Sequence, residues 1–380
     1  MRLFVIAGEP SGDRLGAALM AGLRTLDPEV RFAGVGGPFM QAEGLDSLFP
    51  MDELSVMGIA EVLPKYLHLK RRIAQAAQAA LDSGAEALVT IDSPDFCLRV
   101  ARIVKTTRPA MRTIHYVAPS VWAWRPGRAA KMARWIDHVL ALLPFEPPYM
   151  TAAGMTCDFV GHPVVADPLA MPGDKAGFGG EGPLLLALPG SRRGEITRLA
   201  PVFGQVVGRL VRAHPTLRVA LPTLPGIEGQ VRDLTRDWPV APRIVTDPGE
   251  KRGAFAAARV ALAASGTVSL ELAANGCPMV IAYDMHPLTL WLMRRAALVD
   301  TVTLVNLVSE TRAVPEFIGR DCRAERIAPV LGDLIAEGPA RAAQRAAMAR
   351  TMQLLGQGGE PPGLRAARSV MAAVAGRRNP

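Results

Sequence analysis

Short apolar segments alternate with amphipathic stretches along almost the whole chain. Each apolar segment runs into a turn rich in Gly, Pro or Ser, and a helical pattern follows the turn. This alternation predicts parallel strands that are covered by helices on both faces of a sheet. We expect strands at 3–7, 31–35, 87–91, 113–117, 139–143 and 158–160 in the first half, and at 184–188, 218–221, 243–246, 260–263 and 278–282 in the second.

A change in composition separates the two halves. Residues 166–182 contain two prolines and a Gly-Gly pair but little apolar periodicity, which is typical of an interdomain linker. The sequence therefore predicts an α/β protein with two doubly wound, Rossmann-like domains, 1–165 and 183–355, facing each other across a cleft. A helical tail follows at 356–380, and we expect its last helix, 364–375, to pack back onto the first domain.

The turn after the strand at 260–263 is a candidate phosphate site. Ser265, Gly266 and Thr267 stand between this strand and a short helix, where the first backbone N–H groups of the helix can bind an anion. Glu271, about one turn further on, could accept hydrogen bonds from sugar hydroxyls. Phosphates together with a diol indicate a nucleoside diphosphate, although Thr267 as the N-cap of an ordinary helix explains the same pattern equally well.

A second basic turn follows the strand at 184–188. Ser191 and Arg192 precede a helix in a Pro-Gly-Ser-Arg-Arg sequence, and guanidinium groups bind phosphate in a bidentate manner. The alternative is a solvated basic turn. Asn306, which follows the last core strands, is a weaker candidate for contact with the diphosphate or the sugar.

The first domain offers two turns with acidic residues. After the first strand, Glu9, Ser11, Gly12 and Asp13 form a Gly-containing turn whose glycine spacing is not that of a dinucleotide-binding loop. We expect it to contribute to the acceptor side of the cleft, where carboxylates accept hydrogen bonds from hydroxyls.

The turn after the strand at 87–91 contains Asp92 and Asp95. A carboxylate at the carboxyl end of a buried strand can deprotonate an attacking hydroxyl, and Asp92 is nearer the strand. Asp95 is equally explained as the cap of the next helix. The chain has no Asp-x-Asp pair of the kind that clamps Mg²⁺ on a diphosphate, so neither a metal nor a cofactor is predicted.

The loop at 119–128 has the sequence Pro-Ser-Val-Trp-Ala-Trp-Arg-Pro-Gly-Arg. Aromatic and cationic residues in a Pro-bounded loop suit the binding of a sugar or phosphate, which makes Trp122 and Arg125 candidates for the acceptor side. A structural loop that fills the core is nearly as good an interpretation.

Residues 51–72 are unusually apolar and end in a basic run. Val56, Met57, Val62, Leu63 and Leu67 are the apolar residues that we expect to contact a membrane surface or acyl chains, with Lys70-Arg71-Arg72 beside them. A helix of the protein core is the alternative for this segment.

Composition limits the possible partners. The net charge of +8 favours an anionic partner, and because no nucleic-acid-binding module is recognisable, lipid or phosphate is preferred to nucleic acid. No apolar run reaches the roughly 18 residues of a membrane-spanning helix. The four scattered cysteines have no metal-ligand spacing, as expected for reduced thiols in the cytoplasm.

Together these motifs resemble the lipid-A-disaccharide synthase family, which consists of inverting glycosyltransferases with the two-domain GT-B architecture. The resemblance runs nearly from end to end, and the tryptophan loop is its most specific part. Pro10, Ser93 and Cys97 depart from residues that are frequent in the family. The matching stretches are 7–13, 35–38, 56–58, 61–64, 91–96, 119–128, 159–163, 188–192, 264–267 and 305–307.

The resemblance implies that the enzyme joins UDP-diacylglucosamine to diacylglucosamine 1-phosphate (lipid X), releasing UDP and forming a β-1,6-linked disaccharide for lipid A. It implies Asp92 as the base, Arg192 and Asn306 in donor handling, and Glu271 as the ribose-binding acid. It also implies a cytoplasmic protein held peripherally at the inner face of the inner membrane by an anionic surface. The sequence leaves the oligomeric state open.

Two other functions remain to be separated from this one. A UDP-sugar epimerase with the same two-domain scaffold would bind a similar donor but would need no acyl groove. A non-catalytic membrane-associated binding protein would need no base.

Overall fold

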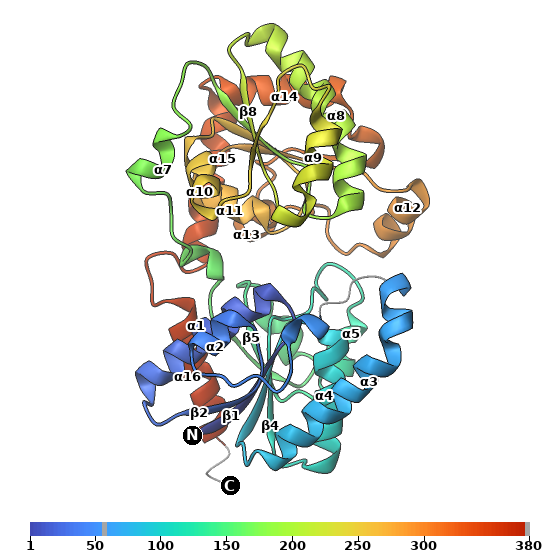
Figure 1. Cartoon of the computed structure of the whole chain (residues 1–380), viewed down its shortest axis with the longest axis vertical. Coiled ribbons are helices and arrows are strands. Elements are labelled where there is room, and N and C mark those ends of the chain that lie inside the picture. The colour runs from blue at the N-terminus through green and yellow to red at the C-terminus, as the bar shows by residue number, and fades with distance from the viewer. Residues whose placement is uncertain (55–58, 377–380) are drawn as a thin grey trace. The chain divides into compact units, whose positions relative to one another are not determined.

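The chain forms two compact units in the computed structural model, which describes residues 1–54 and 59–376. The first unit consists of Met1–Ala166 and Gly358–Pro380, and the second of Asp167–Gln357. Each unit is built around one six-stranded sheet in which every pair of neighbouring strands is parallel (Figure 1). The prediction of two doubly wound α/β domains is therefore confirmed.

The sheet of the first unit has the strand order β2-β1-β3-β4-β5-β6. Strands β3 and β5 are buried along their whole length, and β4 is buried after its first residue, because helices cover both faces of the sheet. The strands are β1 (Arg2–Ala7), β2 (Arg31–Val35), β3 (Ala87–Ile91), β4 (Arg112–Tyr116), β5 (His138–Ala141) and β6 (Thr156–Phe159).

Two layers of helices enclose this sheet. Buried residues of α1 and α16 pack on one face, and those of α3 and α4 pack on the other. Proline stands in the first turn of α1, α4 and α16, where its fixed φ favours helix initiation and its missing N–H costs nothing. The helices are α1 (Pro10–Leu26), α2 (Pro38–Ala42), α3 (Ile59–Asp82), α4 (Pro94–Thr107), α5 (Gly127–Met132), α6 (Pro147–Thr151) and α16 (Pro362–Ala375).

Helix α16 returns to the first unit after the chain has completed the second. Figure 1 shows it in red beside the blue α1, and the two helices are in extensive contact. Ser369 ties α16 to the sheet: its hydroxyl donates to Asp158 (2.6 Å) and lies 2.8 Å from Nε2 of the buried His138. The predicted return of the last helix to the first domain is confirmed.

The sheet of the second unit has the order β12-β11-β10-β7-β8-β9. Its strands are β7 (Leu184–Leu188), β8 (Arg218–Pro222), β9 (Arg243–Val245), β10 (Val260–Ala263), β11 (Met279–Tyr283) and β12 (Glu316–Ile318). Its helices are α7 (Pro172–Ala176), α8 (Arg193–Ala213), α9 (Glu228–Thr235), α10 (Pro248–Ala257), α11 (Val268–Ala274), α12 (Pro287–Ala296), α13 (Leu304–Ser309), α14 (Ala324–Ile335) and α15 (Pro339–Leu354).

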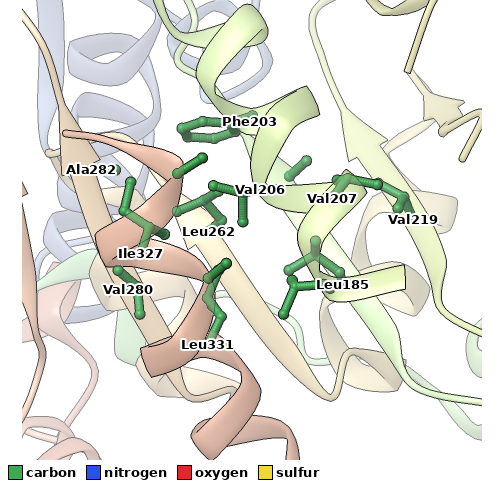
Figure 2. Packing of buried hydrophobic residues seen from close by; sticks show 14 of the residues in the cluster. Leu185, Phe203, Val206, Val207, Val219, Leu262, Val280, Ala282, Ile327 and Leu331 are labelled. Carbon is green, nitrogen blue, oxygen red and sulfur yellow. The ribbon is translucent and has the colours of Figure 1, made fainter. Parts of the chain in front are cut away.

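One core of the second unit lies between its sheet and the helices α8 and α14. Figure 2 shows Phe203, Val206 and Val207 of α8 packed with side chains of the central strands, while Ile327 and Leu331 of α14 complete the cluster. All five side chains are essentially inaccessible to solvent. This burial stabilises the second unit and fixes the positions of the turns that follow β7 and β10.

The differences from the predicted strands have local causes. The strand predicted at 113–117 stops at Tyr116, because Val117 has a φ of 84° and leaves the extended conformation. The strand predicted at 139–143 stops at Ala141, and the next two backbone N–H groups donate instead to Glu146. Strand β12 was not predicted, because its three residues carry no apolar alternation of useful length.

The segment predicted as a linker carries a helix. Helix α7 lies within 166–182 and packs against α10 of the second unit. Asp174 of this helix also lies 3.7 Å from the guanidinium of Arg252. Most of the segment therefore belongs structurally to the second unit.

Candidate functional site

A cavity of about 490 Å³ lies at the carboxyl ends of β7 and β10, which are neighbours in the sheet of the second unit. Such an edge is where ligands bind in open parallel sheets. Six of the predicted donor-binding residues line this cavity: Ser191, Arg192, Ser265, Gly266, Thr267 and Glu271. Two turns that are far apart in the sequence thus meet in one site, as predicted.

Glycines give both turns their shape. Gly190 has a φ of 113° and Gly266 a φ of 133°, conformations that L-residues rarely adopt. A Cβ on Gly190 would lie 2.5 Å from Oε2 of Glu195, whereas a Cβ on Gly266 would meet no atom within 4 Å. The turn at Gly266 is therefore open on the side where a side chain would stand.

The hydroxyl of Thr267 does not cap the helix that follows. Helix α11 begins at Val268, and its N-cap, Thr267, makes no hydrogen bond through its side chain. Both Gly266 and Thr267 are exposed at the cavity. Thr267 therefore does not act as a side-chain cap, and its hydroxyl is not used to start the helix.

Charged side chains on the cavity wall are already partly paired. Arg192 is 3.3 Å from Glu195, which also accepts a hydrogen bond from the hydroxyl of Tyr283 (3.2 Å). Glu271 accepts a 2.6 Å hydrogen bond from Lys251 of α10. No sequence motif marked Lys251 as a site residue. Lys251 lies on helix α10, which precedes β10, and not in the turn after β10.

Asn306 is a correction to the predicted donor site. Its side chain is fully buried, donates to Thr301 and to the carbonyl of Val314, and accepts from the N–H of Val314 (3.0 Å). The cavity lining does not include it. Because its amide is used within the protein, Asn306 holds the segment between α13 and β12 together.

In the first unit, strained backbone marks the turns at the carboxyl ends of β3 and β4. Asp92 (φ 50°), Ser93 (φ 43°) and Val117 (φ 84°) all lie in the left-handed region. This conformation costs energy for residues other than glycine, and for a β-branched residue such as Val117 it is rare. Strain of this kind concentrates at functional sites, where the surrounding structure maintains it.

A cavity of about 430 Å³ opens beside these turns and is lined by both Asp92 and Val117. Burial raises the pKa of Asp92, although a hydrogen bond from the N–H of Ser93 opposes the shift. His115, on the same wall, is buried, and burial lowers its pKa to about 4, so that its imidazole is neutral at pH 7. Among the acidic residues predicted for the first-domain site, Asp92 is therefore the best placed to accept a proton.

A third cavity of about 350 Å³ adjoins this one. Apolar side chains of α3 and α4 line part of it, the charged Glu9 and Lys70 line another part, and it shares Pro94, Asp95 and Arg99 with the cavity beside Asp92. The hydroxyl of Ser93 lies 3.4 Å from a carboxylate oxygen of Glu9. Glu9 is therefore close to the predicted base, as an acceptor-side residue should be.

The other residues of the first turn are corrections. Asp13 is buried, and its carboxylate accepts hydrogen bonds at 2.9–3.0 Å from the N–H groups of Gly37, Phe39 and Met40 at the start of α2. Gly12 is buried against the backbone of β3, and the exposed Ser11 lines none of these cavities. Asp13 and Gly12 thus serve the fold.

The tryptophan loop divides into an anchored and an exposed part. Trp122 is buried, donates its indole N–H to Glu146 (3.2 Å) and packs edge-to-face on Phe145, so its prediction as a cleft residue is wrong. Arg125 is exposed, has a φ of 52° and stacks on Trp124 at 4.2 Å. Arg125 lines neither of the cavities beside Asp92.

The apolar segment can be compared with the structure only in part. Val56 and Met57 lie outside the described residues, as do the side chains of Val62 and Leu63. Leu67 on α3 is 72 % exposed, which is high for a leucine. In the described part of the chain, no helix combines the length and apolarity that a bilayer crossing requires.

Sequence comparisons give one consistent family. A family model described as lipid-A-disaccharide synthetase matches residues 3–361. The lipid-A-disaccharide synthase of Ruegeria pomeroyi is 61 % identical over 98 % of this chain and 95 % of its own length. That of Rhodospirillum centenum is 47 % identical over 97 % of this chain and 94 % of its own length.

Solved structures share the fold at low sequence identity. The UDP-GlcNAc 2-epimerase of Neisseria meningitidis, bound to UDP-GlcNAc, matches 99 % of this chain and 100 % of its own with a TM-score of 0.67 and 11 % identity. Acinetobacter baumannii MurG covers 99 % of both chains with a TM-score of 0.57 and 12 % identity. The fold is therefore that of the GT-B glycosyltransferases and of these epimerases.

Proposed function

The chain belongs to the lipid-A-disaccharide synthase family, and we propose that it transfers diacylglucosamine from UDP to the 6-hydroxyl of diacylglucosamine 1-phosphate. The family relationship, which extends over nearly the whole chain, carries this proposal. The products are UDP and the β-1,6-linked disaccharide 1-phosphate of lipid A synthesis. The substrates are a UDP-sugar and a phosphorylated glycolipid acceptor.

In this proposal UDP binds in the 490 Å³ cavity of the second unit. The Gly266 turn offers backbone N–H groups and two hydroxyls, and Arg192 offers a guanidinium, which together match a diphosphate. Glu271 accepts hydrogen bonds from ribose hydroxyls with the carboxylate oxygen that Lys251 does not hold. The same donors stabilise the charge that develops on the leaving diphosphate.

Asp92 is the proposed general base. Its carboxylate takes the proton of the acceptor hydroxyl while the hydroxyl oxygen forms a bond to the anomeric carbon of the donor. The bond from that carbon to the UDP oxygen breaks, and UDP leaves with the electron pair. A single displacement inverts the anomeric configuration and forms no covalent enzyme intermediate. The raised pKa of Asp92 suits this role, since a stronger base drives the proton transfer better.

The epimerase alternative is not favoured. The epimerases resemble this chain only in fold, at 11–13 % identity, whereas the synthases are 61 % and 47 % identical to it. The two adjoining cavities, which both combine charged and apolar lining residues, also suit an acylated acceptor, which an epimerase does not use.

We also propose that the protein works at the inner face of the inner membrane, where acylated substrates reside. The basic balance of the chain and the exposed Leu67 beside Lys70 support binding to an anionic surface. Replacing Val56, Leu63 and Leu67 with serine is expected to reduce binding to vesicles containing anionic lipid. Unchanged partition of the folded variant would contradict this proposal.

The decisive experiment is a direct assay. Purified protein is incubated with UDP-diacylglucosamine and lipid X, and UDP and the disaccharide are measured by mass spectrometry. Equimolar formation of both products is expected. Conversion of a non-acylated UDP-sugar into an epimer, with no disaccharide, would instead establish the alternative.

A further inference from the structure

Three cationic side chains line the cavity beside Asp92. Arg99 comes from α4, and Arg128 and Lys131 come from α5. Within the described part of the chain none of these three forms an ion pair, although many other arginines do. The carboxylates on the same wall, Asp92 and Asp95, lie beyond the 4.0 Å ion-pair distance from all three.

The three cations border a concave site, although Arg99 and Lys131 are themselves exposed and Arg128 is half-buried. The cations come from two helices and converge on one concave site of about 430 Å³, which also holds the strained turns at Asp92 and Val117. The three cations outnumber the two carboxylates on the same wall, Asp92 and Asp95, so the cavity carries an excess of positive charge. An anion in the cavity would balance this excess and gain charge-assisted hydrogen bonds.

The adjoining cavity adds apolar surface beside this site. Leu54, Tyr66, Leu69, Ile73 and Phe96 form its apolar wall, and the remaining lining includes the charged residues Glu9, Lys70, Asp95 and Arg99. Pro94, Asp95 and Arg99 at the start of α4 border both cavities. A cluster of cations beside a cavity with an apolar wall matches a molecule that carries a phosphate and a hydrocarbon chain.

We propose that the 430 Å³ cavity binds the phosphate monoester of the acceptor, with Arg99, Arg128 and Lys131 as its ligands, while the 350 Å³ cavity receives part of an acyl chain. A phosphate monoester carries a charge of about −1.5 to −2 at neutral pH, which three cations neutralise. This inference rests on the proposed function only in assigning the phosphate to the acceptor substrate.

The donor diphosphate is a less suitable occupant. Its proposed ligands, Arg192 and the Gly266 turn, belong to the second unit, where they line a separate cavity. The cavity beside Asp92 instead places the phosphate site next to the base that must meet the acceptor hydroxyl. Binding the phosphate there would orient the acceptor as well as hold it.

A substrate comparison tests the phosphate contact. The double variant Arg128→Ala, Lys131→Ala and the wild type are assayed with diacylglucosamine 1-phosphate and with diacylglucosamine that lacks the phosphate. For the wild type, we expect the KM of the phosphorylated acceptor to be about 10- to 100-fold lower, as charge-assisted hydrogen bonds allow. The double variant should lose this preference and keep its KM for UDP-diacylglucosamine.

Matched controls are available on the same helix and beside it. The variant Arg102→Ala changes a residue one turn beyond Arg99 on α4, and Arg134→Ala removes an exposed cation just after α5. Neither Arg102 nor Arg134 lines the cavity. Both should keep the preference for the phosphorylated acceptor. If the double variant keeps it too, or if it raises the KM of both acceptors equally, the proposed site is wrong.

A binding experiment separates this proposal from the catalytic one. Soluble glucosamine 1-phosphate is titrated into the full-length wild type and the double variant and followed by calorimetry, with glucosamine as the uncharged reference. Saturable binding of the phosphate by the wild type alone supports the site even if no disaccharide forms. If the wild type makes disaccharide but prefers neither acceptor, the phosphate site fails while the proposed function stands.

Discussion

The two units use the same edge of the same type of sheet but build their turns differently. After β7 and β10 of the second unit, the residues with positive φ are glycines, Gly190 and Gly266. After β3 and β4 of the first unit, they are Asp92, Ser93 and Val117. A glycine turn presents backbone donors without strain, which suits binding. A strained turn with side chains fixes the direction of a functional group, which suits chemistry.

The largest expected effect follows from removing the base. Asp92→Asn should lower kcat by about 10²- to 10⁴-fold, the range that general-base catalysis contributes. UDP affinity should hardly change, because UDP binds to the second unit in our proposal. Kinetics and UDP titration measure the two quantities.

Asp95→Asn is the matched control for this change, since Asp95 lines the same cavity and is exposed. Its kcat should stay within a few-fold of the wild type. The wild-type kcat should also rise with pH as the Asp92 carboxyl, with its raised pKa, ionises. If a folded Asp92→Asn variant keeps nearly full turnover, Asp92 is not the base, and the strained turn after β3 does not serve the chemistry.

The second prediction concerns the buried Glu146, which anchors Trp122 and the turn after β5. Burial raises its pKa to about 7 from an ordinary 4.5. Between these values the unfolded chain loses the proton first, so this group makes the folded state less stable as pH rises, by on the order of 3 kcal/mol in total. Above pH 7 its contribution no longer changes.

Glu146→Gln cannot ionise and should lose this part of the pH dependence. Thermal unfolding of both proteins from pH 4.5 to 8 gives the comparison, and the slope with pH is the readout rather than the absolute Tm. Parallel Tm curves for the variant and the wild type would show that Glu146 is not buried as described.

The third prediction concerns the binding turn. Arg192→Ala should weaken UDP binding by about 10- to 100-fold, because one charge-assisted contact with phosphate is lost. Arg198→Ala, at an exposed position of helix α8, which begins directly after Arg192, is the control and should bind UDP normally. Calorimetric titration with UDP distinguishes them, and equal affinities would exclude Arg192 from the donor site.

The smallest expected effects compare the two kinds of turn directly. Gly266→Ala forces a side chain into a glycine conformation and should lower the free energy of unfolding by about 1–2 kcal/mol, although the space beside it is open. Ser93→Gly should raise it by about 0.5–1 kcal/mol by relieving strain. Denaturant unfolding measures the free energy of unfolding of both variants. If both substitutions change it in the same direction, the distinction between an unstrained glycine turn and a strained turn is wrong.

Much of this organisation could be predicted because it depends on local sequence. Alternating apolar segments identified most strands, and the turns at Asp92, Arg192 and Ser265 follow directly from strand ends. In parallel sheets, turns at the same edge converge, so neighbouring strands bring Arg192 and Ser265 together. This part needs no knowledge of long-range packing.

The errors concern polar residues whose partners lie elsewhere in the chain. Asp13, Trp122 and Asn306 stand in prominent motifs, but the structure pairs them with α2, Glu146 and Val314. A motif shows that a polar residue is present and not whether solvent or protein satisfies it. The cavity-lining cations Lys131 and Lys251 were missed for the opposite reason, since they lie on helices and reach the cavities only in three dimensions.

The placement of α16 has a consequence for synthesis on the ribosome. The first unit is discontinuous: residues 167–357 are translated between its sheet and the helix that covers one face of that sheet. Until α16 emerges, the apolar surface that Ala366, Val370 and Val374 will bury has no cover. The inserted unit, whose residues are contiguous, can fold first, whereas the unit that begins translation is completed last and keeps this apolar surface exposed until then.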